Sequence, residues 1–398
     1  MNQLFLQAKP LLDTIERAGY EAYFVGGAVR DHLLGRKISD VDIATSASPE
    51  EVKEIFKKTV DVGIEHGTIL VIYQGIPYEV TTFRSESGYT DYRRPAKVEF
   101  IRSLTEDLQR RDFTMNAIAM DKDFTIIDPY QGREAIQKGI IRTVGEANDR
   151  FHEDALRMMR AVRFVSQLTF DIEESTYAGL RKNAYLMEKI AAERILMEFN
   201  KLLSGRNKQK AIRLLMDSGL SSFLPGFHGS HEALIAFAEL DTGNLTDASE
   251  NWALLLYLFS LKDEDSFLRS WKMSVKDIKN IKSIGSYLKK RLNAPLRKLE
   301  LFQAGMQTAL SAEKLFMSVK GINESSGLQE VEEAYRSLPI RHTKELAVNG
   351  NDLMQWTDRN SGPWIRNALD TALEQVLEQK IENDKNSLRE LLANCNLI

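Results

Sequence analysis

The stretch that decides the fold is FVGGAVRDHLLGRKISDVDIAT, residues 24–45. It begins inside a short apolar run, residues 22–25, which is typical of a buried strand. The two glycines that follow predict a tight turn and a close approach of the backbone to a ligand, because glycine has no Cβ. Residues 28–34 favour a short helix. We therefore expect a strand, a glycine turn and a helix in direct succession.

Charged side chains in this stretch indicate what it could bind. Arg30 falls in the expected helix, where it and nearby backbone N–H groups would face an anion. Asp40 and Asp42 alternate with apolar residues, so in a strand both carboxylates would share one face. Two adjacent negative charges are costly unless a cation lies between them, and hard oxygen ligands suit Mg²⁺. The pattern predicts the phosphate and metal sites of nucleotidyl transfer, although Asp-x-Asp alone would more often be a solvated turn.

Composition limits the class of protein. The 398 residues are enough for about two to four domains, and 43% of them are hydrophobic. The formal net charge of −4 gives no global basic signature, so contacts with nucleic acid must come from local patches. The one cysteine, Cys395, excludes a disulfide framework and cysteine-ligated zinc, and it fits a reducing cytoplasm.

Neither a secretion signal nor a membrane span is expected. Residues 1–20 favour an amphipathic helix with charged residues along it, rather than a signal peptide. No run approaches the roughly 20 apolar residues that a spanning helix needs. The P-loop and Rossmann glycine fingerprints are also missing from the sequence. We therefore expect a cytoplasmic protein that binds phosphate by other means.

Paired strands and a loop are predicted next. Residues 68–73 and 78–83 favour strands joined by a turn. The second strand carries Glu79, a candidate third carboxylate beside the two aspartates, although a surface glutamate fits the pattern as well. Residues 84–95 are polar and lack periodicity, which predicts a mobile loop leading into a strand at 97–101.

Residues 107–117 predict a helical segment with two adjacent arginines, Arg110 and Arg111, at its start. Its Asn116 could bind a sugar or phosphate oxygen through the side-chain amide. The alternative is an ordinary arginine pair on the surface, which is common.

From residue 148 onward the sequence predicts helices. The first, residues 151–168, carries polar residues at three-residue intervals, which drift by about 60° per step around a helix. These residues are Asp154, Arg157, Arg160 and Arg163. The first three can line one flank, while the fourth has rotated away. An intrahelical salt bridge between Asp154 and Arg157, worth only about 0.2–0.5 kcal/mol, is the alternative.

A basic band occupies residues 272–298, with nine Lys/Arg and one acid, Asp277. It could contact a phosphate backbone, or it could be a solvated helix face. The six histidines do not gather with acids in the C-terminal part, so a separate phosphohydrolase domain is not expected.

Six motifs, in this order, resemble those of the bacterial class II tRNA nucleotidyltransferases, the CCA-adding enzymes of the Bacillus-like type. They are GGAVRD, DVD, RRDFTMNA, DPYQG, EDALR and AERILMEF. The resemblance spans the whole chain and implies an α+β fold, in which a polymerase β-like nucleotidyltransferase sheet domain precedes an all-helical neck, body and tail. The implied divisions are a head at 1–148, a nucleotide-selecting neck at 149–222, a body at 223–295 and a tRNA-binding tail at 296–398.

The resemblance also implies roles for residues and partners. Asp40 and Asp42 would be catalytic and would hold Mg²⁺. The implied nucleotide-binding residues are Gly27, Arg30, Arg111, Asp154, Arg157, Arg160 and Arg163. Glu193 and Arg194 fall in the last neck motif, whose role in the family is more structural. CTP and ATP would be the substrates, tRNA the partner through its acceptor stem and 3′ end, and a homodimer the assembly; residues 84–95 would take part in the change from CTP to ATP.

Hydrogen-bond polarity supports the role of Asp154 and Arg157. Cytosine and adenine both present an amino donor next to a ring-nitrogen acceptor on the Watson–Crick edge. An aspartate can only accept and an arginine can only donate, so this pair fits both bases. Uracil and guanine present the reverse order and would leave two mismatches, each costing about 1–3 kcal/mol. Two side chains could thus replace a nucleic-acid template.

Three other functions remain as alternatives. An enzyme that adds only part of CCA, or a bacterial poly(A) polymerase, would share the same head. The complete loop at 84–95 argues against an enzyme that stops after CC, and the long basic extension expected of the polymerase is missing from the sequence. A non-catalytic RNA-binding helical protein is disfavoured by the retained carboxylates.

Overall fold

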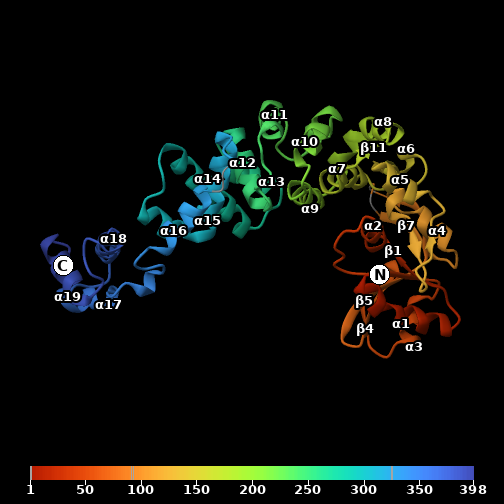
Figure 1. Ribbon diagram of the computed structural model, residues 1–398, viewed down its shortest axis with the longest axis horizontal. Helices are drawn as coiled ribbons and strands as arrows, with labels where there is room; N and C mark the ends of the chain where they lie inside the picture. Colours follow the sequence, from red (N-terminus) through yellow and green to blue (C-terminus); the bar gives the residue numbers. More distant parts are fainter. Residues whose placement is uncertain (1, 91, 93, 324–325) are drawn as a thin grey trace. The chain divides into compact units, whose positions relative to one another are not determined.

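The described residues of the computed structural model fall into two compact units (Figure 1). The first contains the chain up to Ala238 together with Ser270–Lys272, and the second contains Glu239–Arg269 and Met273–Ile398. The structure describes residues 2–90, 92, 94–323 and 326–398. The predicted α+β class is confirmed, because a sheet-bearing part is followed by helices. The finer division into head, neck, body and tail stays a prediction.

Seven strands within the described residues form the central sheet of the first unit, in the order β3-β4-β5-β2-β1-β8-β9. Strand β1 pairs antiparallel with β2, with Val25 opposite Asp42. Strand β2 runs parallel to β5, with Ile43 opposite Val80. The strands are β1 Ala22–Val25, β2 Asp42–Thr45, β3 Thr59–Gly63, β4 Thr68–Tyr73, β5 Ile76–Thr82, β8 Ala119–Met120 and β9 Ile126–Ile127.

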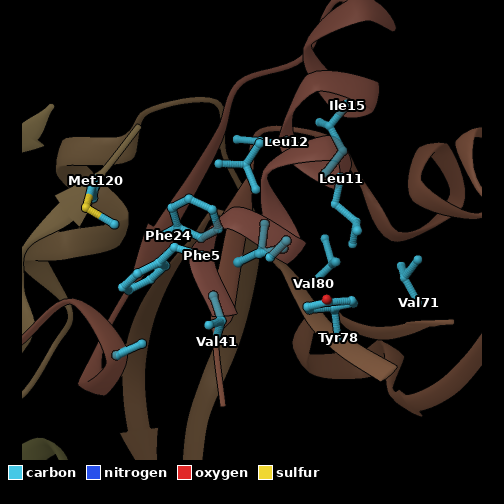
Figure 2. Close-up of a cluster of buried hydrophobic side chains, with 14 of the residues drawn as sticks. Phe5, Leu11, Leu12, Ile15, Phe24, Val41, Val71, Tyr78, Val80 and Met120 are labelled. Carbon is cyan, nitrogen blue, oxygen red and sulfur yellow. The ribbon is translucent and has the colours of Figure 1, made fainter. Parts of the chain in front are cut away.

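Helix α1, Gln3–Arg17, packs its apolar face against this sheet. Figure 2 shows the resulting core, in which Phe5, Leu11, Leu12 and Ile15 lie beside Phe24, Val41, Val71, Tyr78, Val80 and Met120. The predicted N-terminal amphipathic helix is thus part of the core that holds β1 and β2 in place. Further helices of this part are α2 Gly27–Leu33, α3 Pro49–Ile55, α4 Leu104–Gln109 and α5 Gly132–Lys138, with 3₁₀ helices η1 Ile64–His66 and η2 Thr114–Asn116.

The predicted strand–turn–helix–strand is present, but its second strand is shorter than expected. Strand β2 begins at Asp42, so Asp40 lies in the segment before it. The expectation that both aspartates stand on one face of a strand is therefore wrong for Asp40.

The predicted mobile loop at 84–95 is also wrong, because most of it is a β-hairpin. Strands β6, Arg84–Thr90, and β7, Arg94–Phe100, pair antiparallel, with Glu86 opposite Val98. The Glu86 carboxylate accepts hydrogen bonds from Arg84 Nε at 2.7 Å, Arg110 Nη1 at 3.2 Å and the Tyr89 hydroxyl at 2.7 Å. Charge pairing at Glu86 adds to the antiparallel backbone pairing of the described part of the hairpin, and the polar side chains that form it account for the lack of hydrophobic alternation.

The two adjacent arginines end a helix rather than begin one. Helix α4 stops at Gln109, and Arg110 and Arg111 follow it. The next residues are fixed by burial of Phe113 and Met115, which are both fully buried. A short helix, an arginine pair and a 3₁₀ helix therefore replace the single helical segment predicted for 107–117.

The predicted helix at 151–168 is broken in two. Helix α6 ends at Glu153, α7 begins at Leu156, and Asp154 between them has extended dihedrals, φ −139° and ψ 102°. The break is stabilised because the Leu156 N–H donates to Asp154 Oδ1 at 3.1 Å, as in a helix N-cap. The neighbouring elements are α6 Ala147–Glu153, α7 Leu156–Leu168, α8 Glu174–Asn183, α9 Ala192–Leu203, α10 Lys208–Asp217 and α11 His231–Glu239, with η3 Ala184–Lys189 and η4 Leu220–Phe223.

One short strand, β11, departs from the helical pattern expected after residue 148. Strand β10, Ile140–Ile141, runs parallel to β11, Asp171–Ile172. Two-residue strands carry too little alternation to be recognised in a sequence.

Helices make up the second unit, around a core that includes Leu301, Leu353, Leu373 and Leu388. Gly305 interrupts α15 with φ 72°, a left-handed conformation that suits glycine. The helices are α12 Ala248–Phe259, α13 Glu264–Ser270, α14 Val275–Asn293, α15 Lys298–Lys320, α16 Ser326–Arg336, α17 Gly350–Thr357, α18 Pro363–Leu377 and α19 Lys385–Asn394, with η5 Thr343–Glu345. Among the described residues, no helix is both long and apolar enough to cross a membrane.

The basic band at 272–298 is partly neutralised in the fold. The Arg291 guanidinium pairs with the buried Glu313 at 2.5 Å, and Lys289 pairs with Glu264 at 3.0 Å. Further pairs join Lys282 to Asp265 and both Lys290 and Arg297 to Glu300. Fewer of its charges are therefore available to a phosphate backbone than the sequence suggests.

We expect Gly132→Ala to destabilise the fold by about 1–3 kcal/mol, because a Cβ there would overlap the Thr114 carbonyl oxygen and the Ile118 side chain. Chemical denaturation measures the change. Gly285→Ala in α14 is the control, since its Cβ would meet nothing within 4 Å; there alanine should stabilise the helix by about 0.5–1 kcal/mol. An unchanged unfolding midpoint for Gly132→Ala would contradict the packing described here.

Candidate active site

One pocket of about 1110 Å³ in the first unit collects the catalytic and nucleotide-binding residues that the resemblance implies. They are Gly27, Arg30, Asp40, Asp42, Arg111, Asp154, Arg157, Arg160 and Arg163. The pocket is also lined by residues that the sequence did not single out as ligands, including Arg84, Glu86, Asp112, Phe164, Arg194 and Lys201. Glu79 is not among the lining residues.

The acidic end of the pocket is formed by Asp40 and Asp42. Asp40 is exposed, and Asp42, at the start of β2, is partly buried. Burial raises the pKa of Asp42 to about 6, helped by the negative charges of Asp40 and Glu79 and opposed by Arg111. Glu79 therefore acts on this site through its charge. Two carboxylates that repel each other in this way suit a divalent cation. The cation would relieve their repulsion, and their oxygens are the hard ligands that it prefers.

Gly26 brings this acidic end close to an arginine. Its backbone has φ 70° and ψ −139°, so it favours glycine. A Cβ here would lie 3.3 Å from Arg111 Nη1 and 3.4 Å from Asp42 Oδ2. The glycine thus leaves room for both the arginine and the carboxylate beside this turn.

Arg30 is held rigidly in the pocket wall. Its guanidinium donates to Asn116 Oδ1 at 2.6 Å and to both Asp31 oxygens at 3.0 Å. The guanidinium carbon also lies 5.0 Å from the centre of the Phe164 ring on α7. Asn116 is therefore a structural support for Arg30, in addition to any contact that it makes with a ligand.

Two buried guanidinium nitrogens in this pocket lack a hydrogen-bond partner among the described residues. They are Arg111 Nε and Arg163 Nε. A buried donor without a partner costs about 1–3 kcal/mol, and anionic ligand oxygens would remove that cost. Burial, together with the positive charge of Arg160, lowers the pKa of Arg163 to about 10. This side of the pocket is suited to an anion.

Asp112 links the sheet-bearing part to α7, a role that the motif alone did not indicate. Its carboxylate accepts from Arg160 Nε at 2.8 Å, Asn116 Nδ2 at 2.9 Å and the Phe113 N–H at 2.8 Å. Burial alone would raise the pKa of Asp112, but Arg160 and Asn116 hold it well below its usual range. Asp112 is therefore a charged link at the base of the pocket.

Asp154 and Arg157 both line the pocket, but within the described part of the chain their side chains form ion pairs with other residues. Arg157 donates to Glu153 Oε2 at 2.7 Å and to the Arg110 carbonyl at 2.9 Å. Asp154 instead accepts from Arg194 on α9, with its Oδ2 3.0 Å from Nη2. The salt bridge considered as the alternative is thus not formed, because each side chain has another charged partner, although the Arg157 N–H donates to the Asp154 carbonyl at 3.0 Å.

Replacing Asp42 with Asn should stabilise the metal-free chain at pH 8 more than at pH 4. In the fold the carboxyl keeps its proton up to a pKa of about 6, whereas the unfolded chain loses it near about 4. Its ionisation therefore lowers folding stability as the pH rises through that interval. The extra gain at pH 8 should be on the order of 1–3 kcal/mol by chemical denaturation.

The exposed Asp370 provides the control, since Asp370→Asn should change little at either pH. Equal gains for Asp42→Asn at pH 4 and pH 8 would show that ionisation of Asp42 carries no penalty in the fold.

Comparisons with known proteins place this pocket in a family. Residues 22–142 match the Poly A polymerase head domain, residues 169–229 match the probable RNA and SrmB-binding site of polymerase A, and residues 244–392 match a putative domain 2 of tRNA nucleotidyltransferase. The CCA-adding enzyme of Bacillus cytotoxicus is 46% identical over 99% of both chains. That of Geobacillus kaustophilus is 48% identical over 97% of this chain and 96% of its own.

A solved structure indicates the same family. The crystal structure of the Bacillus stearothermophilus CCA-adding enzyme in complex with CTP superimposes with a TM-score of 0.92 at 45% identity, covering 100% of this chain and 98% of the other. The resemblance carried by six short motifs thus extends over the full length. The chain belongs to the CCA-adding enzymes and is a nucleotidyltransferase.

Proposed function

We propose that this nucleotidyltransferase adds C, C and A in turn to the 3′ end of tRNA without a nucleic-acid template, using CTP and ATP and releasing pyrophosphate. The observation that carries the proposal is the single pocket in which the Asp40–Asp42 pair, the arginines and Asp154 meet. Full-length relatives named CCA-adding enzymes support it over partial CCA addition or poly(A) synthesis. A cytoplasmic location and a homodimer belong to the same proposal.

Asp40 and Asp42 would hold the divalent metal that nucleotidyltransferases use, and we propose Mg²⁺. Both side chains supply hard oxygen ligands, and the pKa of Asp42 is raised to about 6 by burial and by its acidic neighbours. When bound, such an ion assists deprotonation of the attacking tRNA 3′-hydroxyl and offsets charge on the α-phosphate.

The phosphates would lie against the arginines at the centre of the pocket. Arg30, fixed by Asn116 and Asp31, offers a positioned charge. Arg111 offers the buried Nε that has no partner among the described residues. Gly27 would let the triphosphate approach the backbone closely, as its Cα carries no side chain. Arg160 and Arg163 would supply further positive charge facing the nucleotide.

Asp154 and Arg157 would select the base. Within the described part of the chain, Arg157 Nη1 donates to Glu153 and to the Arg150 carbonyl, and one Nη2 hydrogen goes to the Arg110 carbonyl. Nε and the second Nη2 hydrogen are left to donate to the ring nitrogen of cytosine or adenine. Asp154 would accept the amino hydrogen of either base. Uracil and guanine would place acceptor against acceptor and donor against donor.

The β6–β7 hairpin is the proposed moving part in the change from CTP to ATP, in place of the mobile loop expected earlier. The Tyr92 carbonyl near its tip accepts a hydrogen bond from the Ala155 N–H at 3.2 Å, directly beside Asp154. Movement of the hairpin would thus reach the base-reading carboxylate through one backbone contact.

The helical regions after the head would bind the tRNA. We propose a head at 1–148, a neck at 149–222, a body at 223–295 and a tail at 296–398. The family match over residues 244–392 to a tRNA nucleotidyltransferase domain supports tRNA binding by the body and tail.

Incubating the chain with tRNA lacking CCA and each labelled nucleotide tests the proposal directly. We expect incorporation of C and A but not of U or G. Asp42→Ala should lower addition by at least roughly a thousandfold, because the metal would stabilise the charge of the transition state by several kcal/mol. Binding of tRNA in a gel-shift assay should be retained. Asp61→Ala on the exposed edge strand β3 is the control and should keep full activity.

The same assay tests the hairpin. A chain shortened within 87–97 should add both C residues and then fail at A. Unimpaired turnover by Asp42→Ala would refute the metal assignment, and normal A addition by the shortened chain would remove the hairpin from the mechanism.

A further inference from the structure

Arg194 occupies a position that is unfavourable for its own helix. It lies in the first turn of α9, Ala192–Leu203, where Ala191 is the N-cap and makes no side-chain capping hydrogen bond. The N-terminus of a helix carries partial positive charge, so a cation there is destabilising by a few tenths of a kcal/mol or more. A compensating partner is therefore expected, and the fold provides one.

That partner is Asp154, in a two-point contact. Arg194 Nη1 lies 3.3 Å from Oδ1 and Nη2 lies 3.0 Å from Oδ2. The exposed fractions of the two side chains are 22% and 19%, so the pair stands at the pocket wall rather than on the open surface. Parallel donation from a planar guanidinium fixes the plane of the carboxylate as well as its position.

Asp154 depends on this contact because its backbone is not part of a helix. It sits in the break between α6 and α7 with extended dihedrals. The other contact of its carboxylate with the described residues is the Leu156 N–H, 3.1 Å from Oδ1. One hydrogen bond leaves the carboxylate free to rotate about it, whereas three define its orientation. A carboxylate accepts about four hydrogen bonds, so one acceptor site remains for a base.

We propose that Arg194 is a positioning residue for base selection, which holds Asp154 so that its remaining acceptor site meets the amino group of cytosine or adenine. The inference rests on the proposed function of Asp154. Helix α9 would thus contribute to base selection through Asp154, although Arg194 itself does not contact the nucleotide.

Two substitutions of Arg194 separate charge from geometry. Arg194→Lys keeps the positive charge but loses the planar guanidinium that donates at two points. Arg194→Gln keeps one donor group without the charge. We expect both to lower the ratio of kcat/KM for CTP over UTP by roughly tenfold or more, since bonds to a charged group are worth about 1.5–3 kcal/mol. KM for CTP should rise more than kcat falls, because the Asp40–Asp42 end of the pocket is untouched.

Arg142→Lys is the matched control. Arg142 pairs with Glu173 at 2.7 Å, its side chain is 27% exposed, and it does not line the active-site pocket. It should keep the wild-type CTP/UTP ratio. In the Asp154→Asn background, Arg194→Lys should cause little further loss, since the residue acts through the carboxylate.

The outcomes distinguish the two proposals. If the wild-type chain adds no C or A to tRNA, the proposed function fails. If it does, and folded Arg194→Lys or Arg194→Gln keeps the wild-type CTP/UTP ratio, only the role of Arg194 is overturned. A crystal of the wild-type chain with CTP needs no substitution: Arg194 should keep both bonds to Asp154, and a guanidinium turned away from it would overturn the inference.

Discussion

A buried carboxylate joins the sheet-bearing part of the first unit to helix α7, and the active-site pocket depends on this link. Asp112 accepts from Arg160 Nε at 2.8 Å and from Asn116, which in turn accepts from Arg30 at 2.6 Å. Removing Arg160 would leave the buried Asp112 carboxylate without its charged partner, which destabilises the fold. The link therefore fixes where α7 lies, and with it Arg157 and Arg163.

Negative and positive side chains gather in different parts of the pocket. Asp40 and Asp42 stand at one end, and the guanidinium groups of Arg30, Arg160 and Arg163 gather around the Phe164 ring, 5.0, 5.7 and 4.0 Å from its centre. A cation would suit the first group, and a triphosphate would add to the carboxylates of Asp112 and Glu198 that already pair with Arg160 and Arg163 in the second. The separation matches the two charged partners of nucleotidyl transfer.

Much of the site could be predicted because its chemistry lies in short, contiguous stretches. The glycine pair, Arg30 and the Asp40–Asp42 motif needed only local pattern, and β1, α2 and β2 formed around them. The hairpin could not be predicted, because one of the contacts that stabilise it joins Glu86 to Arg110, which is distant in the sequence. Likewise, the helical periodicity of 151–168 gave no sign of the break at Asp154, whose carboxylate pairs with Arg194 from another helix. Long-range ion pairs leave no periodic trace in a sequence.

Base selection by one acceptor and one donor is the central claim, and a nucleotide without the amino group tests it most directly. Zebularine 5′-triphosphate keeps the ring nitrogen and carbonyl of CTP but lacks the 4-amino group. Measuring kcat/KM for both nucleotides on tRNA lacking CCA should show a loss of about ten- to a hundredfold for the analogue, because Asp154 would be left without its donor. Equal use of the two nucleotides would contradict the account.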